Sequence, residues 1–479
     1  MDVLQIVGIA GALLTAAGIL HAVARHIGVT ATLAWIFAML AVPFAGPIAY
    51  FLLAGPRLRR ARRHRRLAGE AVRKAMRRRL GHAGFPPAVV ASSPLAQSVA
   101  ALGTRLTGLA PSGGKHVALR TDNARTFEEM KQSVLAAERS VWAEYYIVSD
   151  DSTGRAFLAL LAGKARQGVD VRLLYDAVGS SDIPGDELET LRGAGGRAEA
   201  FLPVNPFRRR WAVHLRNHRK LLVVDGEKAF LGGMNVGDAY AGGSAAGSTP
   251  AERPWRDTNL SLTGPAVADL ATVFAEDWTF ASGDRLVPPS VPVPARGGSV
   301  VGIVPSGPDQ AANAAEQTYF AAVTGARSRC WLTTPYFVPD EGTLRALASA
   351  AFRGVDLRIL VPAHGDVAVA QAAGRWYYRA LLRAGARVFE YEPAVLHAKT
   401  LVVDGAFSLV GSANLDFRSF GLNFELGAVV FDPAFAEELE LRFEADLAES
   451  REVTRAEVEQ RPLLERLRCG GARLLAPLL

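Results

Sequence analysis

Cysteine is scarce in this chain: Cys330 and Cys469 are the only two in 479 residues, and they lie far apart. Two thiols without C-x-x-C spacing support neither a structural zinc site nor a disulfide framework. Acidic residues at the spacing of metal ligands are also missing. We therefore expect no metal ion and no cofactor. We expect two free thiols, with Cys330 in the core, and leave a disulfide between them open.

Acidic residues are nearly absent from the N-terminal segment. Residues 1–80 contain thirteen Lys and Arg against only Asp2 and Glu70, whereas the rest of the chain carries 41 basic and 45 acidic residues. The formal charge of +7 thus belongs to one segment, and the body is mildly acidic. This distribution argues against nucleic acid as a partner. The length and the 49% of apolar residues predict two or three folded domains rather than a disordered chain.

Charged residues are missing from two long runs, 3–24 and 27–56. Each run exceeds the roughly 20 residues that cross a bilayer, and only Arg25 and His26 separate them, so we predict a transmembrane helical hairpin. A cleaved signal peptide is the alternative for the first run, but Asp2 stands where such a peptide needs positive charge. We expect the second run to kink or bend at three residues: Pro43, Gly46 and Pro47.

A dense cationic cluster, RLRRARRHRR at residues 57–66, directly follows the second run. Positive residues beside a span mark its cytoplasmic side, so we expect both termini in the cytoplasm and Arg25 outside. The same cluster is suited to attract the anionic phospholipid headgroups of the bilayer. An arm that binds nucleic acid is the competing interpretation, which the two adjacent apolar runs disfavour.

An internal repeat occupies much of the remaining chain. HRKLLVVDGEKAFLGGMN at 218–235 matches HAKTLVVDGAFSLVGSAN at 397–414 with a constant offset of 179, and GVDVRLLYD at 168–176 echoes GVDLRILVP at 354–362. In each half a helical pattern precedes an apolar strand, and a strand pair that carries the motif follows. This alternation predicts an α/β fold, duplicated, with the two halves facing each other.

The repeated motif carries two pairs of side chains suited to phosphate chemistry. Residues i and i+2 of a strand face the same way, so His218 projects together with Lys220, and His397 projects together with Lys399. We expect the lysines to neutralise phosphate oxygens. We expect the histidines to supply a nucleophile and a general acid.

Each motif continues into a D-G step and a G-[GS]-x-N tail. Asp225 and Asp404 are candidate catalytic residues, although an Asp-Gly step between two apolar runs favours a structural role in a hairpin turn. The tails supply positions for close backbone approach to a ligand and for hydrogen bonds to it: Gly233, Ser412, Asn235 and Asn414.

Two further acids stand at equivalent places after the motifs. An offset of 168 aligns TGPAV at 263–267 with FDPAF at 431–435 and so pairs Asp257 with Glu425, each ahead of an apolar strand. A carboxylate on each side can hold a histidine tautomer and stabilise its charged form. We therefore predict that each carboxylate lies within hydrogen-bonding distance of a motif histidine. A turn or an ordinary ion pair is the alternative for either acid.

These motifs resemble those of the phospholipase D superfamily, whose mark is two H-x-K-x4-D sequences followed by G-[GS]-x-N. More closely, the chain resembles bacterial cardiolipin synthases over nearly its whole length. Gly233 in place of a serine is a minor departure. The resemblance rests on AWIFAMLAVPFAGPIAYFLLAG in the second apolar run, EYYI at 144–147, TPYFVPDE at 334–341, GSANLDFRSFGLNFE at 411–425 and RLLAPLL at 473–479.

The resemblance implies two pseudo-symmetric phospholipase D-like α/β/α domains and a metal-free exchange at phosphorus. One histidine attacks phosphatidylglycerol, releases glycerol and forms a phosphohistidine, and a second phosphatidylglycerol then takes the phosphatidyl group to give cardiolipin. By resemblance His218 is the nucleophile and His397 the general acid and base, although the near-symmetry of the repeat leaves that order open. The resemblance also implies a multi-pass enzyme of the bacterial inner membrane with cytoplasmic catalytic domains; a homo-oligomer is left open.

The chain divides into a two-span anchor at 1–56, a basic juxtamembrane linker at 57–115, phospholipase D-like domains at 116–284 and 300–450 joined by a Pro-rich linker at 285–299, and an amphipathic tail at 451–479. The tail either lies on the membrane or packs against the core. A hydrolase of the same superfamily, with water in place of the second lipid, is the nearest alternative function. A nuclease and a non-enzymatic membrane scaffold are weaker alternatives, because the body is acidic and both motifs are intact.

Overall fold

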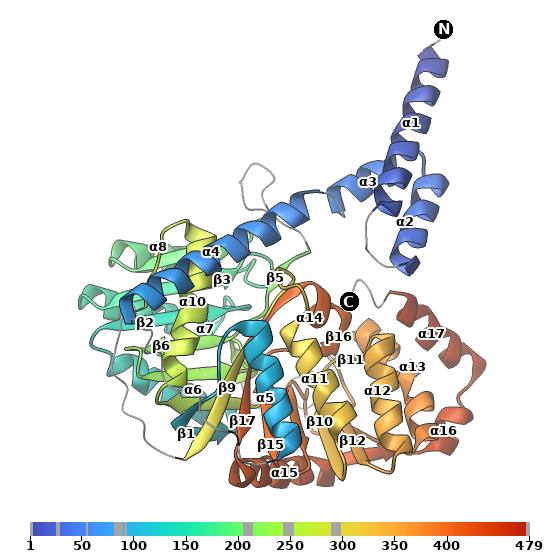
Figure 1. The fold of residues 1–479 in the computed structure, drawn as a ribbon. Coiled ribbons are helices and arrows are strands. Elements are labelled where there is room, and N and C mark those ends of the chain that lie inside the picture. Colours follow the sequence, from blue (N-terminus) through green and yellow to red (C-terminus); the bar gives the residue numbers. More distant parts are fainter. Residues whose placement is uncertain are drawn as a thin grey trace.

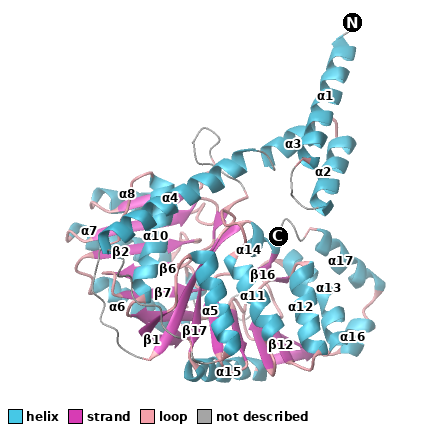
Figure 2. Cartoon of the chain, viewed as in Figure 1, coloured by secondary structure: helices cyan, strands magenta, loops and turns pink. Residues whose placement is uncertain are grey.

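The structure is a computed structural model that describes residues 3–24, 29–53, 56–80, 90, 93–204, 214–242, 253–288 and 298–475. Most of the expected Pro-rich linker and the last four residues of the tail lie outside the described residues. Figures 1 and 2 show a body of strands covered by helices, with the N-terminal helices projecting from it.

One continuous sheet of 16 strands runs through the body. In each half, three parallel strands are followed by four antiparallel ones, and the second half adds β18 (Ser450–Val453), antiparallel to β13 (Arg387–Tyr391), at its outer side. The two halves join edge to edge where β1 (Ser112–Arg120) pairs antiparallel with β9 (Ser299–Ser306). The two predicted domains are therefore more closely joined than a pair of separate, facing units. The sequence did not indicate this continuity, because the junction strands lie outside the repeated motif.

In sheet order, the strands of the first half are β4 (Arg197–Phe201), β3 (Asp170–Asp176), β2 (Ser140–Tyr145), β6 (Leu221–Val224), β7 (Lys228–Gly232), β8 (Asn259–Thr263) and β1 (Ser112–Arg120). Those of the second half are β9 (Ser299–Ser306), β17 (Asn423–Phe431), β15 (Phe407–Gly411), β14 (Thr400–Val403), β10 (Arg329–Thr333), β12 (Asp356–Pro362), β13 (Arg387–Tyr391) and β18 (Ser450–Val453). Three short strands complete the set: β5 (Arg216–Asn217), β11 (Phe337–Val338) and β16 (Leu415–Asp416).

Helices cover both faces of the sheet, as the α/β/α prediction requires. The alternation of side chains along β6 shows this, because Leu221 and Val223 join one hydrophobic cluster with α10, whereas Leu222 and Val224 join another with α6, α7 and α8. In the second half α15 corresponds to α10. The bounds are α6 (Asn123–Leu135), α7 (Ser152–Arg166), α8 (Gly185–Gly193), α10 (Ala266–Ser282), α11 (Ala314–Gly325), α12 (Glu341–Phe352), α13 (Ala368–Ala384) and α15 (Pro433–Ala448).

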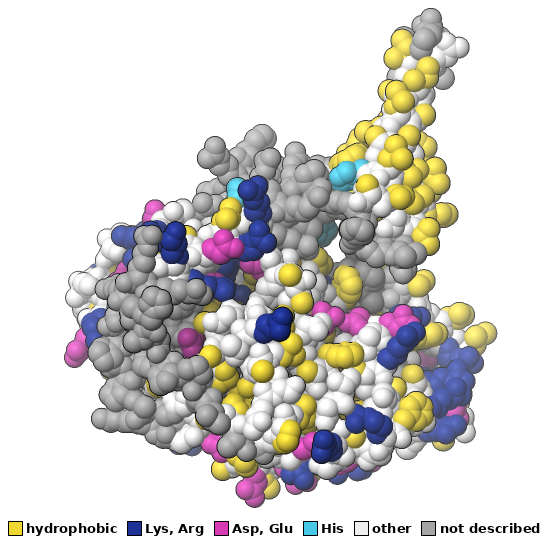
Figure 3. All heavy atoms as spheres, viewed as in Figure 1, with side chains coloured by type: hydrophobic (Ala, Val, Ile, Leu, Met, Phe, Trp, Pro, Cys, Tyr) yellow, Lys and Arg dark blue, Asp and Glu magenta, His cyan; other side chains and the backbone are white. Residues whose placement is uncertain are grey.

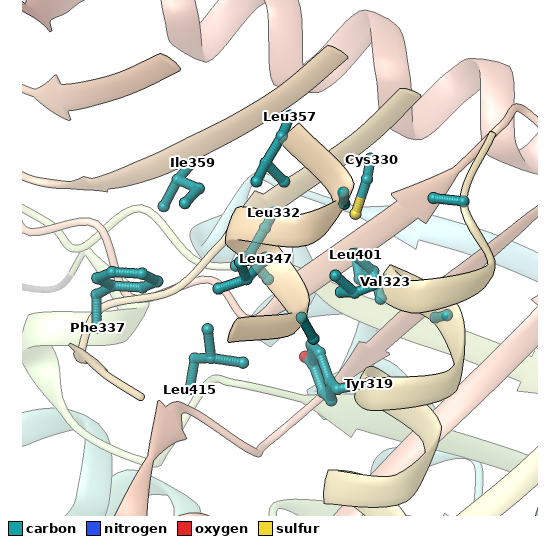
Figure 4. Packing of buried hydrophobic residues seen from close by; sticks show 14 of the residues in the cluster. Tyr319, Val323, Cys330, Leu332, Phe337, Leu347, Leu357, Ile359, Leu401 and Leu415 are labelled. Atoms are coloured by element: carbon teal, nitrogen blue, oxygen red, sulfur yellow. The ribbon is translucent and has the colours of Figure 1, made fainter. Parts of the chain in front are cut away.

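The hydrophobic core does not divide at the boundary between the halves. The cluster that contains α10 also contains residues of α15 and of strands from both halves. A second cluster, under α11 and α12, packs Leu332 and Leu347 with Cys330 (Figure 4). Cys330 and Cys469 are both buried and unbonded to each other, so the prediction of two free thiols is confirmed.

The segment expected to be a basic linker carries two helices that pack on the body. α4 (Pro56–Leu80) lies along α10, and α5 (Pro94–Thr107) packs on α11 and β9. Arg65 of the cationic cluster is buried, and its Nε donates to Asp277 Oδ1 at 2.7 Å. Arg73 Nε donates to Glu276 Oε1 at 2.6 Å. These two cations therefore hold α4 to the first half rather than facing a lipid surface.

Three apolar helices precede α4, namely α1 (Val3–Val23), α2 (Val29–Ala41) and α3 (Ala45–Leu53), which contact one another. The predicted break in the second apolar run is confirmed, because helix stops after Ala41 and resumes at Ala45, and Phe44 between them has a φ of 66°. Within the described ranges, no helix combines the length and the apolar character that crossing a membrane requires. The pair of spans stays a prediction.

Candidate active site

The motif histidines lie at the end of the sheet where the parallel strands have their carboxyl ends. Lys220 and Lys399 directly precede β6 and β14. Leu221 pairs with Glu144 near the end of β2, and Thr400 pairs with the last residue of β10. Both motifs therefore begin at the carboxyl ends of the parallel strands, which is where α/β sheets form their ligand sites.

Short parallel pairings bring the two halves together at this end of the sheet. β5 pairs with β17 of the other half, and an equivalent bridge stands just before the second motif. The backbone amide of His218 donates to the carbonyl of Phe424 at 2.9 Å, and the amide of His397 donates to the carbonyl of Arg256 at 2.7 Å. Each histidine is thus held by the half of the chain that does not contain it.

The side-chain contacts of the histidines also cross from one half of the chain to the other. His218 Nδ1 lies 2.9 Å from Glu425 Oε2, and His397 Nδ1 lies 2.7 Å from Asp257 Oδ2. The predicted contact between each acid and a motif histidine is present on both sides, and it crosses from one half to the other. Because a carboxylate only accepts, Nδ1–H of His218 is the donor to Glu425, and this tautomer leaves Nε2 without a proton and available for chemistry. His397 Nδ1 lies 2.8 Å from Lys399 Nζ as well as beside Asp257.

Burial and neighbouring charges fix the protonation of these pairs. Burial raises the pKa of Asp257, but Lys399 and His397 lower it by more than burial raises it. The net shift of this pKa is therefore downward. Burial likewise raises the pKa of Glu425, but His218, together with Lys220 and Ser412, lowers it by more, so the net shift is again downward. Burial lowers the pKa of His218 to about 4, against the opposing effect of its carboxylate partner. At neutral pH the site therefore holds ionised carboxylates beside a neutral His218.

The two lysines are buried beside the motif histidines. Lys220 Nζ donates to the carbonyl of His218 at 2.7 Å, and Lys399 Nζ donates to the carbonyl of His397. Burial lowers the pKa of Lys399 to about 8 and that of Lys220 well below its ordinary value. An anionic phosphodiester would raise both pKa values again, because a nearby negative charge favours the protonated form. The site is thus suited to a phosphate.

The one departure between the motif tails, Gly233 against Ser412, has a structural cause. The Ser412 hydroxyl donates to Glu425 Oε2, so the serine helps to hold that carboxylate. At the equivalent position, a Cβ on Gly233 would stand 2.1 Å from Asp257 Oδ1. The shorter Asp257 side chain brings its carboxylate against the backbone and leaves no room for a serine. Ser412 and Gly233 therefore orient carboxylates in different ways.

The motif aspartates lie at the opposite end of the strands from the histidines. Asp225 follows β6, so about 17 Å of extended chain separates it from Lys220. Its carboxylate accepts backbone amides at the start of β2, including Ser140 N at 2.8 Å, and Asp404 does the same at the start of β10. Both aspartates have φ near +54°, and a glycine with positive φ follows each. The structure does not bring Asp225 and Asp404 to the reacting groups. Both aspartates stabilise turns, which is the structural role that the Asp-Gly sequences predicted.

The two tail asparagines are buried in the loops that follow β7 and β15. Asn235 Oδ1 accepts from Ile147 N at 3.2 Å, and Asn235 Nδ2 donates to the Tyr240 hydroxyl at 2.8 Å. The backbone N–H of Asn414 donates to Ser419 Oγ at 3.1 Å, whereas its buried side-chain Oδ1 has no hydrogen-bond partner among the described residues. These contacts position the loops after β7 and β15, and direct contact of either amide with a phosphate stays a prediction.

Aromatic rings line the histidines, and sequence patterns did not identify them. The Tyr146 ring meets the His218 ring edge-on at 5.0 Å between centroids, and Lys220 Nζ lies 5.2 Å from the same tyrosine ring. Tyr240 and Trp255 lie 5.5 and 5.1 Å from His397. Tyr146 belongs to the EYYI sequence on which the family resemblance rests, but that sequence does not indicate contact with a histidine. Tyr240 and Trp255 belong to none of the sequence motifs.

Comparison with known sequences places this geometry in a family. Residues 130–278 and 319–447 match the family described as "Cardiolipin synthase, PLD-like domain", which covers more than half of the chain. Residues 13–55 match the description "Phospholipase_D-nuclease N-terminal". The chain belongs to the cardiolipin synthase family of phospholipase D-like proteins.

Particular relatives agree over nearly the full length. The chain is 36% identical over 463 residues to "Cardiolipin synthase A" of Pseudomonas fluorescens, covering 96% of this chain and 95% of the relative. It is 36% identical over 460 residues to "Cardiolipin synthase" of Geobacillus kaustophilus, covering 94% and 89%. Among solved structures, phosphatidylserine synthase of Haemophilus influenzae aligns with a TM-score of 0.59 over 80% of this chain and all of that chain, at 15% identity, which shows a shared fold.

Proposed function

We propose that the chain transfers a phosphatidyl group between two phosphatidylglycerol molecules and so forms cardiolipin and glycerol. One observation carries the proposal most: two histidines, each paired with a buried carboxylate from the opposite half, stand together with two buried lysines. The names and the identity of the relatives support the choice of lipids.

In the first step His218 Nε2 attacks the phosphorus of one phosphatidylglycerol. A P–N bond forms, the P–O bond to the terminal glycerol breaks, and the glycerol oxygen takes a proton from protonated His397. Burial lowers the pKa of His397, but the incoming phosphodiester anion favours the proton on its ring. Asp257 stabilises that imidazolium, as its contact at Nδ1 suits it to do.

In the second step the hydroxyl of another phosphatidylglycerol gives its proton to the now neutral His397. The hydroxyl oxygen attacks phosphorus, the P–N bond breaks, and His218 leaves as the neutral ring that Glu425 orients. The net exchange consumes no water and returns both histidines to their starting protonation. Lys220 and Lys399 neutralise the phosphate oxygens in both steps, which is the main electrostatic demand of transfer at phosphorus.

Exposed apolar side chains at the end of the sheet that carries the motif histidines support a lipid substrate. The segments that follow the carboxyl ends of β3, β4, β12 and β16, including the starts of α13 and of α14 (Phe417–Gly421), carry them at the end of the sheet where the histidines lie. Scattered exposed apolar residues are ordinary, but several that follow strands at the same end of a sheet suit an apolar ligand or a membrane. The set comprises Val178, Val204, Val367, Val369 and Phe417.

The N-terminal helices are the proposed anchor in a bacterial inner membrane. α1, α2 and α3 expose large apolar side chains along their lengths, which Figure 3 shows as yellow atoms on the projecting arm. Water does not favour such a surface, whereas acyl chains do. Together with the cationic cluster that follows, this supports a multi-pass anchor with the catalytic halves, 116–284 and 300–450, in the cytoplasm.

Analysis of the lipid products tests the proposal. The purified full chain is reconstituted into phosphatidylglycerol vesicles with a metal chelator, and the lipids and free glycerol are quantified. We expect cardiolipin and glycerol in equal amounts, and neither product with the H397A variant. Phosphatidic acid with glycerol instead of cardiolipin identifies a hydrolase and overturns the proposed transfer.

A further inference from the structure

The C-terminal helix α17 (Leu463–Leu474) has one face packed and one face open. Cys469 and Ala472 are buried where α17 crosses α13, whereas Leu464 is 80% exposed. At about 100° of rotation per residue, the exposed leucines occupy a single arc of about 120°. The open leucines are Leu463, Leu464, Leu467, Leu474 and, just past the helix end, Leu475.

Arginines flank both edges of this leucine face. On the same helical rotation Arg468 falls beside one edge of the arc, and Arg466 and Arg473 fall beside the other. Arg466 and Arg468 are exposed, and Arg473 lies 5.6 Å from the Trp376 ring. An apolar face bordered by long cationic side chains is the pattern of a helix that lies in the interface of an anionic bilayer.

A groove beneath the helix continues the positive surface. It has a volume of about 260 Å³ and lies between α13, α17 and the short helix α16 (Arg455–Glu459). Glu459 is the only acid in its lining and is paired with Arg383 at 3.1 Å. The remaining charged side chains of the lining are Arg375, Arg379, Arg461 and Arg466. Of these, Arg375 pairs with Glu390 at 3.0 Å and Arg461 pairs with Glu465 at 3.2 Å. Figure 3 shows Lys and Arg side chains in dark blue gathered at the right-hand edge of the body, beside apolar atoms, where Figure 1 shows α13, α16 and α17.

The position of this surface suits contact with the membrane that holds the substrate. α13 begins shortly after β12 ends, at the end of the sheet that carries the histidines. α17 packs against the first half of α13, since Ala368 and Gln371 line a second groove together with Glu465 and Arg468. In Figure 1 α17 forms the upper right of the body, on the side from which the N-terminal helices project.

We propose that α17 is a second membrane-contact surface, which docks on an anionic phospholipid bilayer. The leucine face enters the boundary between headgroups and acyl chains, and the flanking and groove arginines bind lipid phosphates. With the N-terminal helices as the other point of attachment, this contact fixes the orientation of the body and directs the mouth of the site toward the bilayer. The inference goes beyond the transfer reaction and does not depend on which lipid is made.

A fluorescent label at the helix, read by quenchers inside the bilayer, tests the contact. The full-chain L464C variant is labelled and reconstituted into vesicles whose acyl chains carry bromine, with phosphatidylglycerol or phosphatidylcholine headgroups. L441C on α15, where Leu441 is 62% exposed, is the matched control, and both native cysteines are buried. In phosphatidylglycerol we expect about half of the emission from position 464 to be quenched and about a tenth or less from position 441.

A second set of variants tests whether the arginines of α17 are needed for contact with the anionic bilayer. The double variant R466Q/R468Q, carrying the label at 464, should lose most of the quenching, whereas R345Q on α12 should not. Equal quenching at 464 and 441 overturns the proposal. The proposal is also overturned if the emission of the label at 464 changes with the protein-to-lipid ratio and does not change with the bromine content of the acyl chains. That result indicates that a second copy of the chain covers α17. Cardiolipin formation is measured on the same vesicles, so an active enzyme without quenching at 464 refutes this surface alone.

Discussion

At the reacting groups, each imidazole depends on a carboxylate that the other half of the chain supplies. His218 is oriented by Glu425 and His397 by Asp257, so neither half holds a complete base. A repeat with nearly identical motifs can form one asymmetric site in this way. The same backbone arrangement supports both histidine–carboxylate pairs. A serine at Ser412 accompanies the longer Glu425, and a glycine at Gly233 accompanies the shorter Asp257.

Replacing these acids by amides tests their orienting role. In D257N and E425Q the side-chain size is kept, but an amide can donate to Nδ1 and so hold the wrong tautomer. We expect kcat to fall about 100-fold or more with little change in KM and with folding intact. An ordinary ion pair is worth only about 0–1 kcal/mol and would leave the rate within a few-fold of the parent chain, which is the result that removes the acids from the mechanism.

The lysine pKa predicts a pH profile. Because burial lowers the pKa of Lys399 to about 8, the free enzyme loses this positive charge as the pH rises through 8. We expect kcat/KM to fall first as free His397, which must be protonated in the first step and whose pKa burial lowers, loses its proton. A second, alkaline limb should follow above pH 8, and on the acid side kcat/KM should fall near pH 4, where His218 becomes protonated. K399R keeps its charge at high pH and should move the alkaline limb upward. An alkaline limb that stays in place in a folded, active K399R assigns it to another group.

At the level of helices and strands, α4 joins the anchor to the catalytic motif. Asp277 of α10 accepts from Arg65 of α4 and from Arg219, the residue between the motif histidine and lysine. Arg219 Nε also donates to the carbonyl of Glu425 at 3.0 Å. The docking of α4 is therefore connected to the backbone that places the first histidine and its carboxylate.

Removing one cation from this network should be costly. In R65A the buried Asp277 and Glu276 lose a partner, and we expect the free energy of unfolding to fall by about 3 kcal/mol or more. R66A is the matched control, because Arg66 is 63% exposed and pairs with an equally exposed Glu70. Its effect should stay within about 0–1 kcal/mol. Thermal unfolding of the two variants in detergent measures the difference, and equal stability contradicts a structural role for the buried pair.

The helices and strands also show what a sequence can and cannot predict. The repeat predicted the strand pairs, and the Asp225-Gly226 step predicted a turn that its positive φ values confirm. The offset that matched Asp257 with Glu425 established that they are equivalent, but equivalence carries no information on which histidine each one contacts. Arg65 looked like a surface cation because its partner lies 212 residues away.

For the whole molecule, the proposed orientation can be read with single cysteines in intact cells. Both native cysteines are buried, so the background is low. F352C lies on α12, where Phe352 is 72% exposed, and should react with a membrane-impermeant maleimide only after the inner membrane is permeabilised. H26C, between the two predicted spans, should react beforehand. The reverse pattern would place the catalytic halves on the outer side.

The covalent intermediate tests the shared two-histidine site most directly. A phosphatidyl donor whose leaving group needs no proton, such as p-nitrophenol, is mixed with H397A. Attack by His218 should still occur, while transfer to a hydroxyl stalls without its base. We expect a burst of one nitrophenolate per chain, a phosphatidyl adduct on the peptide that contains His218 after alkaline quench, and neither with H218A. A burst without an adduct, or an adduct on neither motif histidine, contradicts the mechanism.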